Sequence, residues 1–221
     1  RRFGRHNKNR TMENGVHHMP RRIKVTVNVA WTLGLFMGDG WTTLRTDGGR
    51  RVGIAGNVTA KRFGLYRAKR VFESWGAGCS IQRASKGRGL NMVAYSAELA
   101  SWFRDAFGRY SRDRRVPEFV FNWSKQLIAA FVAGYLATDG HKNATKTTTQ
   151  WSTASPHIAL QLPLLLAALG APQGVSYSER NKKKNPHWSP AWQGESVHIT
   201  PRNFSRDYAY HSVRSVSTVL A

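Results

Sequence analysis

Cysteine is almost absent from this sequence, and its absence excludes two kinds of site. The single cysteine, Cys79, cannot form a disulfide within the chain, and no cluster of Cys and His residues has the spacing of a zinc site. His17 and His18 are adjacent rather than one helical turn apart, which favours exposed loop residues over metal ligands. A chain without disulfides is typical of a reducing compartment, so we expect an intracellular protein.

A long hydrophobic run is also missing. The longest one, residues 158–169, is interrupted by Gln161 and Pro163 and is too short to span a bilayer. The basic N-terminus shows no signal peptide, and we expect no membrane partner. The hydrophobic content of 41% over 221 residues is still sufficient for a packed core, in one large domain or in two similar small ones.

Acidic residues are the third shortage. Asp and Glu number 12 against 34 Lys and Arg, which gives a formal net charge of +22. Such a chain is expected to bind a polyanion, with an affinity that falls steeply as salt rises, although net charge alone does not distinguish DNA, RNA and an anionic membrane. Residues 1–24 are interpreted as a basic arm, with Arg1, Arg2, Arg5, Lys8, Arg10, Arg21 and Arg22.

What the sequence does contain is one internal repeat. Residues 32–40 read TLGLFMGDG and residues 132–140 read VAGYLATDG, an offset of 100 positions. Small residues recur within both runs at a spacing of four, which places them on one face of a helix. We therefore expect two closely packed helices whose interface is formed by Ala30, Gly34, Gly38, Ala130, Gly134 and Thr138.

Each repeat ends in an Asp-Gly pair. Gly40 and Gly140 are expected to stop the two helices, which leaves Asp39 and Asp139 at their C-terminal ends. A carboxylate is unfavourable there because it faces the negative end of the helix dipole, so a cation is expected to compensate. Two such aspartates in register, in a chain this poor in acidic residues, indicate a function rather than an ordinary turn.

Both runs resemble the LAGLIDADG, or dodecapeptide, motif of homing endonucleases, and LGLFMGDG is most similar to intein-borne members. The resemblance implies an α+β fold of two pseudo-symmetric halves, each built as α-β-β-α-β-β-α with a saddle-shaped antiparallel sheet. The basic arm at residues 1–24 is then followed by a first half at residues 25–122 and a second half at residues 123–221.

Turn and cap signals agree with that order of elements. In the first half we expect strands near residues 41–46, 51–57, 80–84 and 90–96, and helices over residues 59–75 and 97–107. The second half should contain strands within residues 142–153 and near residues 174–180 and 195–200, with a helix that Ser155 caps and Pro156 begins. Pro163 lies inside this helix and should kink it or delay its start.

The resemblance also implies a reaction. Members of the family hydrolyse one phosphodiester in each strand of double-stranded DNA and leave short 3′ overhangs. Asp39 and Asp139 would hold divalent metal ions, with Gly38 and Thr138 beside them in each motif. Mg²⁺ is the expected cofactor, since it needs few protein carboxylates when phosphates supply further oxygen ligands. Mn²⁺ should substitute, whereas Ca²⁺ should support binding only.

The family pattern usually has a lysine shortly before a Val/Ile-Pro step in each half, and here an arginine, Arg114, stands three residues before Pro117. Arg114 lies 75 positions after Asp39, and Arg214 lies 75 positions after Asp139. Arginine can stabilise developing negative charge but cannot shuttle a proton, so the substitution bears on activity. Gln150 is a further candidate, either for ordering active-site water or for contacting a base.

DNA recognition is expected to fall to the two sheets and to a basic, aromatic stretch at residues 181–192. For most of these basic side chains phosphate contacts are favoured over base contacts. The target should be roughly two helical turns long, one for each half, and asymmetric because the halves differ. The candidate contacts are Arg45, Arg51, Arg83, Lys86, Arg88, Lys142, Lys146, Arg180, Lys182, Lys183 and Lys184.

Other readings remain open at this point. The same fold serves RNA maturases, which assist intron splicing, and a non-catalytic DNA-binding regulator is a further alternative; retention of both aspartates favours cleavage. A ribosomal or chromatin-like protein would leave the aspartate pair unexplained.

We expect a monomer in the cytoplasm or nucleoid, with no obligate protein partner. The closing HSVRSVSTVL resembles the point where inteins resume their splicing domain, which favours an isolated intein-type endonuclease domain.

Overall fold

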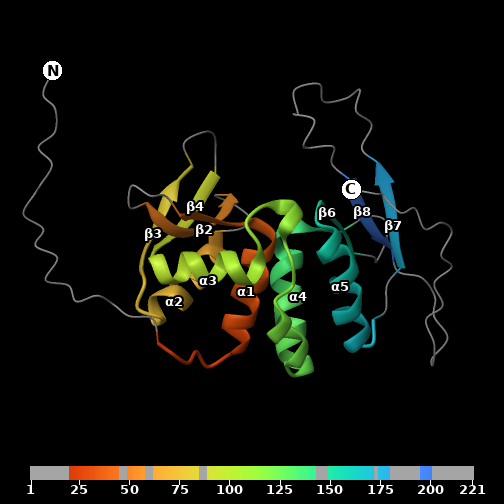
Figure 1. Ribbon diagram of the computed structural model, residues 1–221, viewed down its shortest axis with the longest axis horizontal. Helices are drawn as coiled ribbons and strands as arrows, with labels where there is room; N and C mark the ends of the chain where they lie inside the picture. The colour runs from red at the N-terminus through yellow and green to blue at the C-terminus, as the bar shows by residue number, and fades with distance from the viewer. Residues whose placement is uncertain are drawn as a thin grey trace, which may run out of the picture.

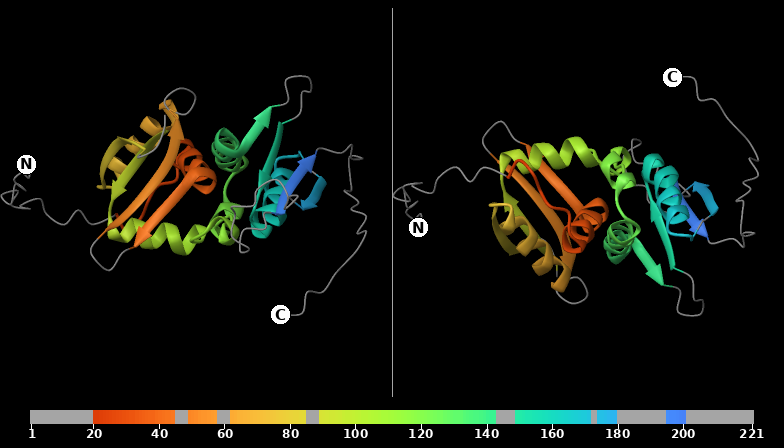
Figure 2. Two further views of the ribbon diagram at one scale, coloured as in Figure 1. Left: turned by 90° about the horizontal axis from the view of Figure 1, so that it is seen from above. Right: turned by 90° about the horizontal axis from the view of Figure 1, so that it is seen from below.

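Two adjacent helices form the centre of the molecule, and a four-stranded sheet lies on either side of them (Figures 1 and 2). The computed structural model describes residues 20–44, 49–57, 62–84, 89–142, 149–171, 174–179 and 195–200. The central helices are α1 (Val27–Asp39) and α4 (Lys125–Asp139). Each therefore contains one copy of the repeat and ends at its aspartate.

The sheet beside α1 is antiparallel, with strand order β1-β2-β4-β3. Its strands and the helices that accompany it are β1 (Gly40–Leu44), β2 (Arg50–Asn57), α2 (Arg62–Ser74), β3 (Gly78–Arg83), β4 (Gly89–Tyr95) and α3 (Ala97–Phe107). The three helices α1, α2 and α3 contact the strands from one side, which leaves the other side of the sheet for a partner (Figure 1).

The second sheet repeats the first in its order, β5-β6-β8-β7. Its elements are β5 (Gly140–Lys142), β6 (Thr149–Thr153), α5 (Pro156–Ala168), β7 (Gly174–Glu179) and β8 (Glu195–Thr200). Two short 3₁₀ helices, Ser111–Asp113 and Glu118–Asn122, lie in the connection that leads from α3 to α4. The repeat in the sequence thus reappears as the same order of helix, hairpin, helix and hairpin.

Burial explains why α1 and α4 are apolar on nearly all sides. In α1 the buried residues include Val29, Leu33, Leu35 and Phe36, which do not share a single face. A helix that is hydrophobic all round belongs in a protein interior, and here α1 is enclosed by α4, α2 and the first sheet. The Thr26 side chain accepts a hydrogen bond from the Val29 backbone N–H at 3.3 Å and so caps the start of α1.

An aromatic cluster fixes α1 against the rest of the first half. The Phe36 ring lies 4.3 Å from that of Phe103 and 5.2 Å from that of Phe107, centroid to centroid. Phe72 of α2 stacks on Phe103 at 5.4 Å. All four rings are fully buried, and such aromatic pairs add to the free energy of area burial. The last turn of α1, which leads to Asp39, therefore packs against buried aromatic side chains.

Several expected boundaries are confirmed and one expectation is wrong. The helix at residues 97–107 is observed with those bounds, and Ser155 caps α5 by accepting from the Ile158 N–H at 3.2 Å. The delayed start that was one of the two effects expected of Pro163 is wrong, because α5 runs without a break from Pro156 to Ala168, and the kink stays a prediction. The missing N–H of Pro163 costs one helical hydrogen bond, and the buried Leu162, Leu165 and Leu166 offset it.

Residues 45–48, between the first two expected strands, and residues 58–61, where the helix expected over residues 59–75 would begin, lie outside the described residues. In the parts of the chain that are described, no helix combines the length and apolar composition that crossing a bilayer requires.

Candidate active site between the two central helices

The backbones of α1 and α4 approach each other at two glycines. A Cβ on Gly34 would stand 1.9 Å from the Phe131 carbonyl oxygen, and a Cβ on Gly134 would stand 2.0 Å from that of Trp31. Phe131 is the residue equivalent to Trp31 in the repeat, so the two contacts are related by a local two-fold axis. The expected stripe of small residues thus lies between the helices, with Ala30 and Ala130 buried beside the glycines.

The helices also meet at their C-terminal ends. A Cβ on Gly38 would lie 1.9 Å from Thr138 Oγ1 and 3.3 Å from Asp139 Oδ2. Because Asp39 follows Gly38 directly, the last residues of the two helices are neighbours in space. Both aspartates are only partly buried. Partial exposure beside a close helix contact is the arrangement that a site for a solvent-borne ion and a phosphate requires.

Gly40 and Gly140 end the helices, but not through the left-handed conformation that terminal glycines often adopt. Gly40 has φ −78° and ψ 154°, and Gly140 has φ −76° and ψ 138°, so each is the extended first residue of a strand. Their need for glycine is steric. A Cβ would lie 2.2 Å from the Phe36 carbonyl oxygen in one case and 2.3 Å from that of Leu136 in the other. The chain can therefore turn at once from Asp39 or Asp139 into a sheet.

Arg114 lies at this end of the helix pair and is buried. Its guanidinium donates to the Gly40 carbonyl oxygen and, at 3.5 Å, to that of Gly108, and it stands 4.9 Å above the Phe36 ring. Burial lowers the pKa of Arg114 to about 10, while the nearby Asp139 carboxylate opposes that change. The group is therefore protonated at neutral pH and supplies a fixed positive charge between the end of α1 and Asp139.

The segment that carries Arg114 is anchored to the second half. The Ser155 hydroxyl donates to the Arg114 carbonyl oxygen, and the Val116 N–H donates to Gln161 Oε1 at 2.8 Å. Ser155 is the N-cap of α5 in the second half, and Gln161 lies near the middle of the same helix. Contacts from α1, α3 and α5 thus hold one arginine, and its position depends on both halves of the chain.

We expect Arg114→Met to lower the free energy of unfolding by about 2–4 kcal/mol, because the buried carbonyl groups of Gly40 and Gly108 lose a charged donor. The exposed Arg83→Met variant should change it by less than about 0.5 kcal/mol. Urea denaturation monitored by tryptophan fluorescence gives both values. Equal stability of the two variants would show that the buried guanidinium does not support the end of α1.

Comparisons with known proteins bear on this arrangement. Residues 126–211 match the family profile described as LAGLIDADG-like domain. The structure is similar to that of I-DmoI in complex with DNA and Mn, with a TM-score of 0.55 and 14% sequence identity over 78% of this chain and 88% of that one. The fold is that of a LAGLIDADG homing endonuclease.

Two further structures of the same endonuclease agree. Mesophilic variants of I-DmoI give a TM-score of 0.56 at 14% identity, covering 78% of this chain and 87% of that one. I-DmoI in complex with DNA and Ca gives 0.53 at 15% identity, covering 78% and 82%. At 14–15% sequence identity, this structural similarity shows the fold alone.

The donors at the C-terminal ends of α1 and α4 suit a hard cation. Asp39 and Asp139 contribute carboxylate oxygens, and backbone carbonyls at Gly38 and Thr138 belong to the helix ends, where carbonyl groups lack helical partners. The Thr138 hydroxyl itself donates to the Tyr135 carbonyl oxygen at 2.6 Å. Within the described residues no group of three or more His, Cys, Asp or Glu forms a metal cage. Oxygen ligands in small number fit Mg²⁺ together with phosphate.

Sequence reasoning missed Tyr135, which lies one helical turn before Asp139 and is fully buried. Burial raises the pKa of Tyr135 and the Asp139 carboxylate raises it further, so the phenol stays protonated. Asp139 and the Thr153 hydroxyl lie close enough to influence it, although its oxygen has no partner at full hydrogen-bonding geometry. The equivalent residue in the first half is Leu35, so the two carboxylates have unlike surroundings. The signal in the sequence that could have identified Tyr135 is its hydroxyl, a polar group within an otherwise apolar repeat.

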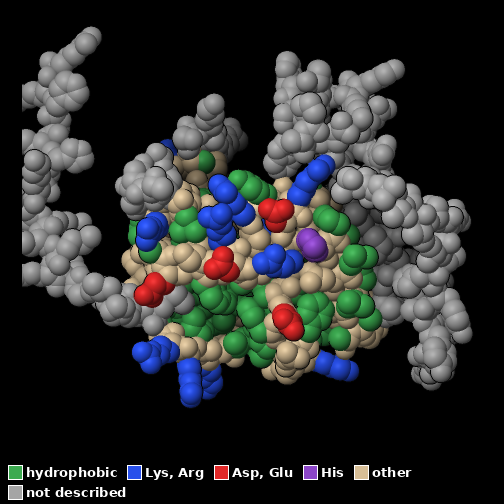
Figure 3. All heavy atoms as spheres, viewed as in Figure 1, with side chains coloured by type: hydrophobic (Ala, Val, Ile, Leu, Met, Phe, Trp, Pro, Cys, Tyr) green, Lys and Arg blue, Asp and Glu red, His purple; other side chains and the backbone are tan. Residues whose placement is uncertain are grey.

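The structure describes only part of the expected DNA-contacting set. Arg51 lies on β2 with its guanidinium 5.7 Å from the Trp41 ring centre, and Arg83 is exposed on β3. Lys142 and Gln150 lie on the paired strands β5 and β6, with side chains outside the described atoms. In Figure 3, Lys and Arg side chains lie over the upper part of the face, among a few acidic ones, and also along its lower edge. Outside the described residues lie Arg45, Lys86, Arg88, Lys146, Arg180, Lys182, Lys183, Lys184 and the candidate catalytic Arg214.

Proposed function

We propose that this chain is a site-specific double-stranded DNA endonuclease that hydrolyses one phosphodiester in each strand and leaves short 3′ overhangs. The observation that carries the proposal is the packing of two glycine-striped helices that end side by side in Asp39 and Asp139. A duplex has two strands, and a pair of carboxylates related by a local two-fold axis offers one to each. A chain with only 12 acidic residues has little other reason to place two of them together.

Divalent cations are part of this proposal. I-DmoI has been studied in complex with DNA in the presence of Mn and of Ca, and a variant of it in the presence of Mg. We propose Mg²⁺ for this chain, with Mn²⁺ as a substitute and Ca²⁺ supporting binding without cleavage. Such ions polarise the phosphate and activate water. Asp39 and Asp139, with the Gly38 and Thr138 carbonyl groups, are the residues that would hold them.

The residues around the carboxylates have separate tasks in this scheme. Arg114 fixes the Gly40 backbone, and with it the end of α1, so that Asp39 keeps its place relative to Asp139. Its positive charge also reduces the repulsion between the two carboxylates. Tyr135 stays neutral, because burial and the Asp139 carboxylate both raise its pKa, so it adds no further negative charge beside Asp139. These groups orient the charge before DNA arrives, which reduces the reorganisation that catalysis requires.

Each sheet would lie along one half of the target. Because the side chains of the two sheets differ, the target would be asymmetric and about two helical turns long. Both carboxylates come from one chain, so we propose a monomer that needs no protein partner. We further propose an intein-type member of the fold, acting in the cytoplasm or nucleoid where chromosomal DNA is accessible.

The test is cleavage of a randomised duplex library by the full chain, followed by sequencing of the cut ends. With Mg²⁺ or Mn²⁺ we expect paired cuts a few nucleotides apart on the two strands, at related sequences. Ca²⁺ should retain the same duplexes on the protein without cutting, and EDTA should prevent cutting. Selective retention without cutting in Mg²⁺ and Mn²⁺ would refute the nuclease and favour a DNA-binding regulator. Retention of structured RNA in preference to duplex DNA would favour a maturase.

A further inference from the structure

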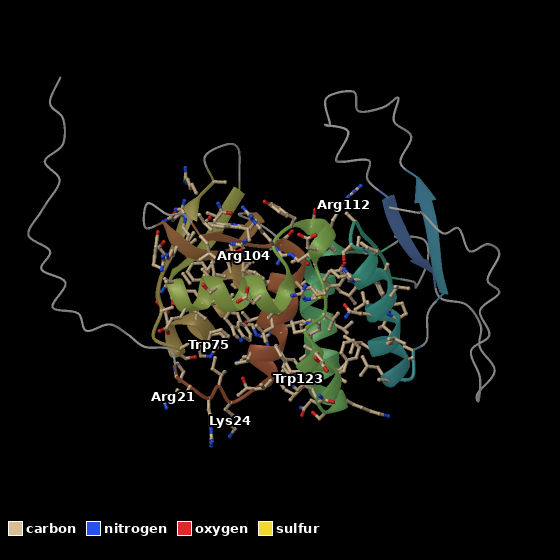
Figure 4. All side chains as sticks on the ribbon, in the orientation of Figure 1. Arg21, Lys24, Trp75, Arg104, Arg112 and Trp123 are labelled. Carbon is tan, nitrogen blue, oxygen red and sulfur yellow. The ribbon has the colours of Figure 1, made fainter. Side chains whose placement is uncertain are left out.

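A second basic surface lies at the opposite end of α1 from Asp39. It is a groove of about 780 Å³ between the segment that leads into α1, residues 20–26, and one face of α2. Counting a helical rise of 1.5 Å per residue from Asn28, the groove is about 16 Å from the end of α1. Lys24, one of the residues that line it, lies at the lower edge of the molecule in Figure 4, whereas the strands lie toward the upper edge.

The charged residues that line this groove are all cationic: Arg22, Lys24, Arg67 and Arg70. Three of these side chains are exposed, and Arg67 is partly buried. No carboxylate is among the described residues that line the groove. The nearby Glu73 forms an ion pair with Lys69 along α2. The chain that precedes Pro20 has the same sign of charge, with Arg1, Arg2, Arg5, Lys8 and Arg10 against Glu13. Charge complementarity therefore requires an anionic occupant from outside this chain.

One of the four cations is held in a fixed orientation. Arg67 Nε donates to Asn28 Oδ1 at 2.9 Å, and the guanidinium lies 4.4 Å from the centre of the Trp31 ring. A guanidinium has five N–H donors, so most of them are left for a ligand after this bond. Because its plane is already set by Asn28 and Trp31, little side-chain entropy is lost when it binds a phosphate. The groove is thus a prepared anion site rather than a set of mobile lysines.

Aromatic rings stand beside these cations. Phe63 is 85% exposed and Tyr66 is 42% exposed, and both lie on the face of α2 that lines the groove. They are three residues apart, so they are neighbours along that face, and Arg67 and Arg70 follow at helical spacing. A phenylalanine this exposed contributes little to folding. Exposed rings interleaved with arginines are suited to stacking bases while the arginines bind the backbone.

We propose that this groove binds an unpaired segment of a nucleic acid strand, as a second site separate from the one that holds the duplex. A base pair in a duplex has no free face for Phe63, whereas an unpaired base stacks on an exposed ring and leaves its phosphate for Arg70. The chemistry is shared by single-stranded RNA and single-stranded DNA. This proposal does not depend on the nuclease activity, because none of its residues is near Asp39 or Asp139.

The test uses the full chain and fluorescent, unstructured oligonucleotides of about twelve nucleotides, one RNA and one DNA. Binding is followed by anisotropy for the wild type and for Phe63→Ala/Arg70→Ala. We expect the dissociation constant for at least one oligonucleotide to rise about tenfold, and that for duplex DNA to stay within about twofold. The matched control is Phe121→Ala/Lys125→Ala, which removes an exposed phenylalanine and an exposed lysine near the start of α4. It should alter neither affinity by more than about twofold.

Three results would overturn the proposal. Equal losses in the groove variant and the control would show that single strands bind through general charge alone. An equal loss of duplex affinity would make the groove part of the duplex surface. A labelled polyglutamate peptide that binds as tightly as the oligonucleotides, and loses as much affinity in Phe63→Ala/Arg70→Ala, would identify an acidic protein segment as the occupant. The oligonucleotide that binds more tightly identifies the source of the strand.

Discussion

Asp39→Asn is expected to reduce double-strand cleavage by at least about a thousandfold, and Asp139→Asn should have the same effect. Asparagine preserves the shape of the side chain but removes the charge that holds a cation. Each aspartate ends one of the two paired helices, so loss of either leaves one strand of the duplex without its carboxylate. The measurement is the rate of linear product formation from a plasmid that carries a target recovered from the library.

Duplex binding should survive these substitutions. In Ca²⁺ we expect the affinity of either variant to remain within about threefold of the wild type, because removal of a carboxylate beside a phosphate does not weaken electrostatic attraction. Asp105→Asn, an exposed aspartate on α3, is the matched control and should cleave normally. Unaltered cleavage by either motif variant would remove that carboxylate from the active site.

Gly34→Ala is expected to destabilise the protein by about 3 kcal/mol, which lowers Tm by roughly 6–12 °C for a domain of this size. The added methyl carbon would stand 1.9 Å from the Phe131 carbonyl oxygen, and a helix backbone cannot move aside as a side chain can. The two helices would have to separate. In an exposed helix the same substitution stabilises by up to about 1 kcal/mol, so a loss of stability would isolate the contact with α4.

The control for this substitution is Gly78→Ala. A Cβ on Gly78 meets nothing within 4 Å, so thermal unfolding should change by less than about 0.5 kcal/mol. Gly134→Ala should resemble Gly34→Ala, because it meets the Trp31 carbonyl oxygen in the related position. The double variant should lose less than the sum of the two, since either methyl group separates the same helices. Equal stability of Gly34→Ala and Gly78→Ala would contradict the close helix contact.

The elements that could be predicted from the sequence are those with local signals. The 100-residue repeat predicted two helices, and the four-residue spacing of Gly34 and Gly38 indicated the face that the partner helix contacts. Ser155 and Pro156 predicted the start of α5 because a cap and a proline at the first turn are properties of neighbouring residues. The delayed start expected from Pro163 was wrong for the converse reason, because the burial of Leu162 and Leu165, which holds the helix together there, comes from tertiary packing.

The parts of the site that sequence reasoning did not reach depend on contacts between distant residues. Arg114 was a candidate from its spacing to Asp39, yet its bond to Gly40 spans 74 positions and requires the fold to be known. Tyr135 was not among the candidates, because its place one helical turn before Asp139 does not by itself show that the side chain is fully buried. The groove beside α2 needs Arg22 and Lys24 to meet Arg67 and Arg70, which only the packing of α1 against α2 achieves.

The central claim is that Asp39 and Asp139 together hold divalent cations at a cleavage site. It is tested most directly by anomalous diffraction from crystals of the chain with its duplex target and Mn²⁺. The account predicts anomalous peaks at coordination distance, about 2 Å, from a carboxylate oxygen of each aspartate and from the cut phosphates. A complex in which Mn²⁺ binds the DNA elsewhere, with neither aspartate as a ligand, would contradict it.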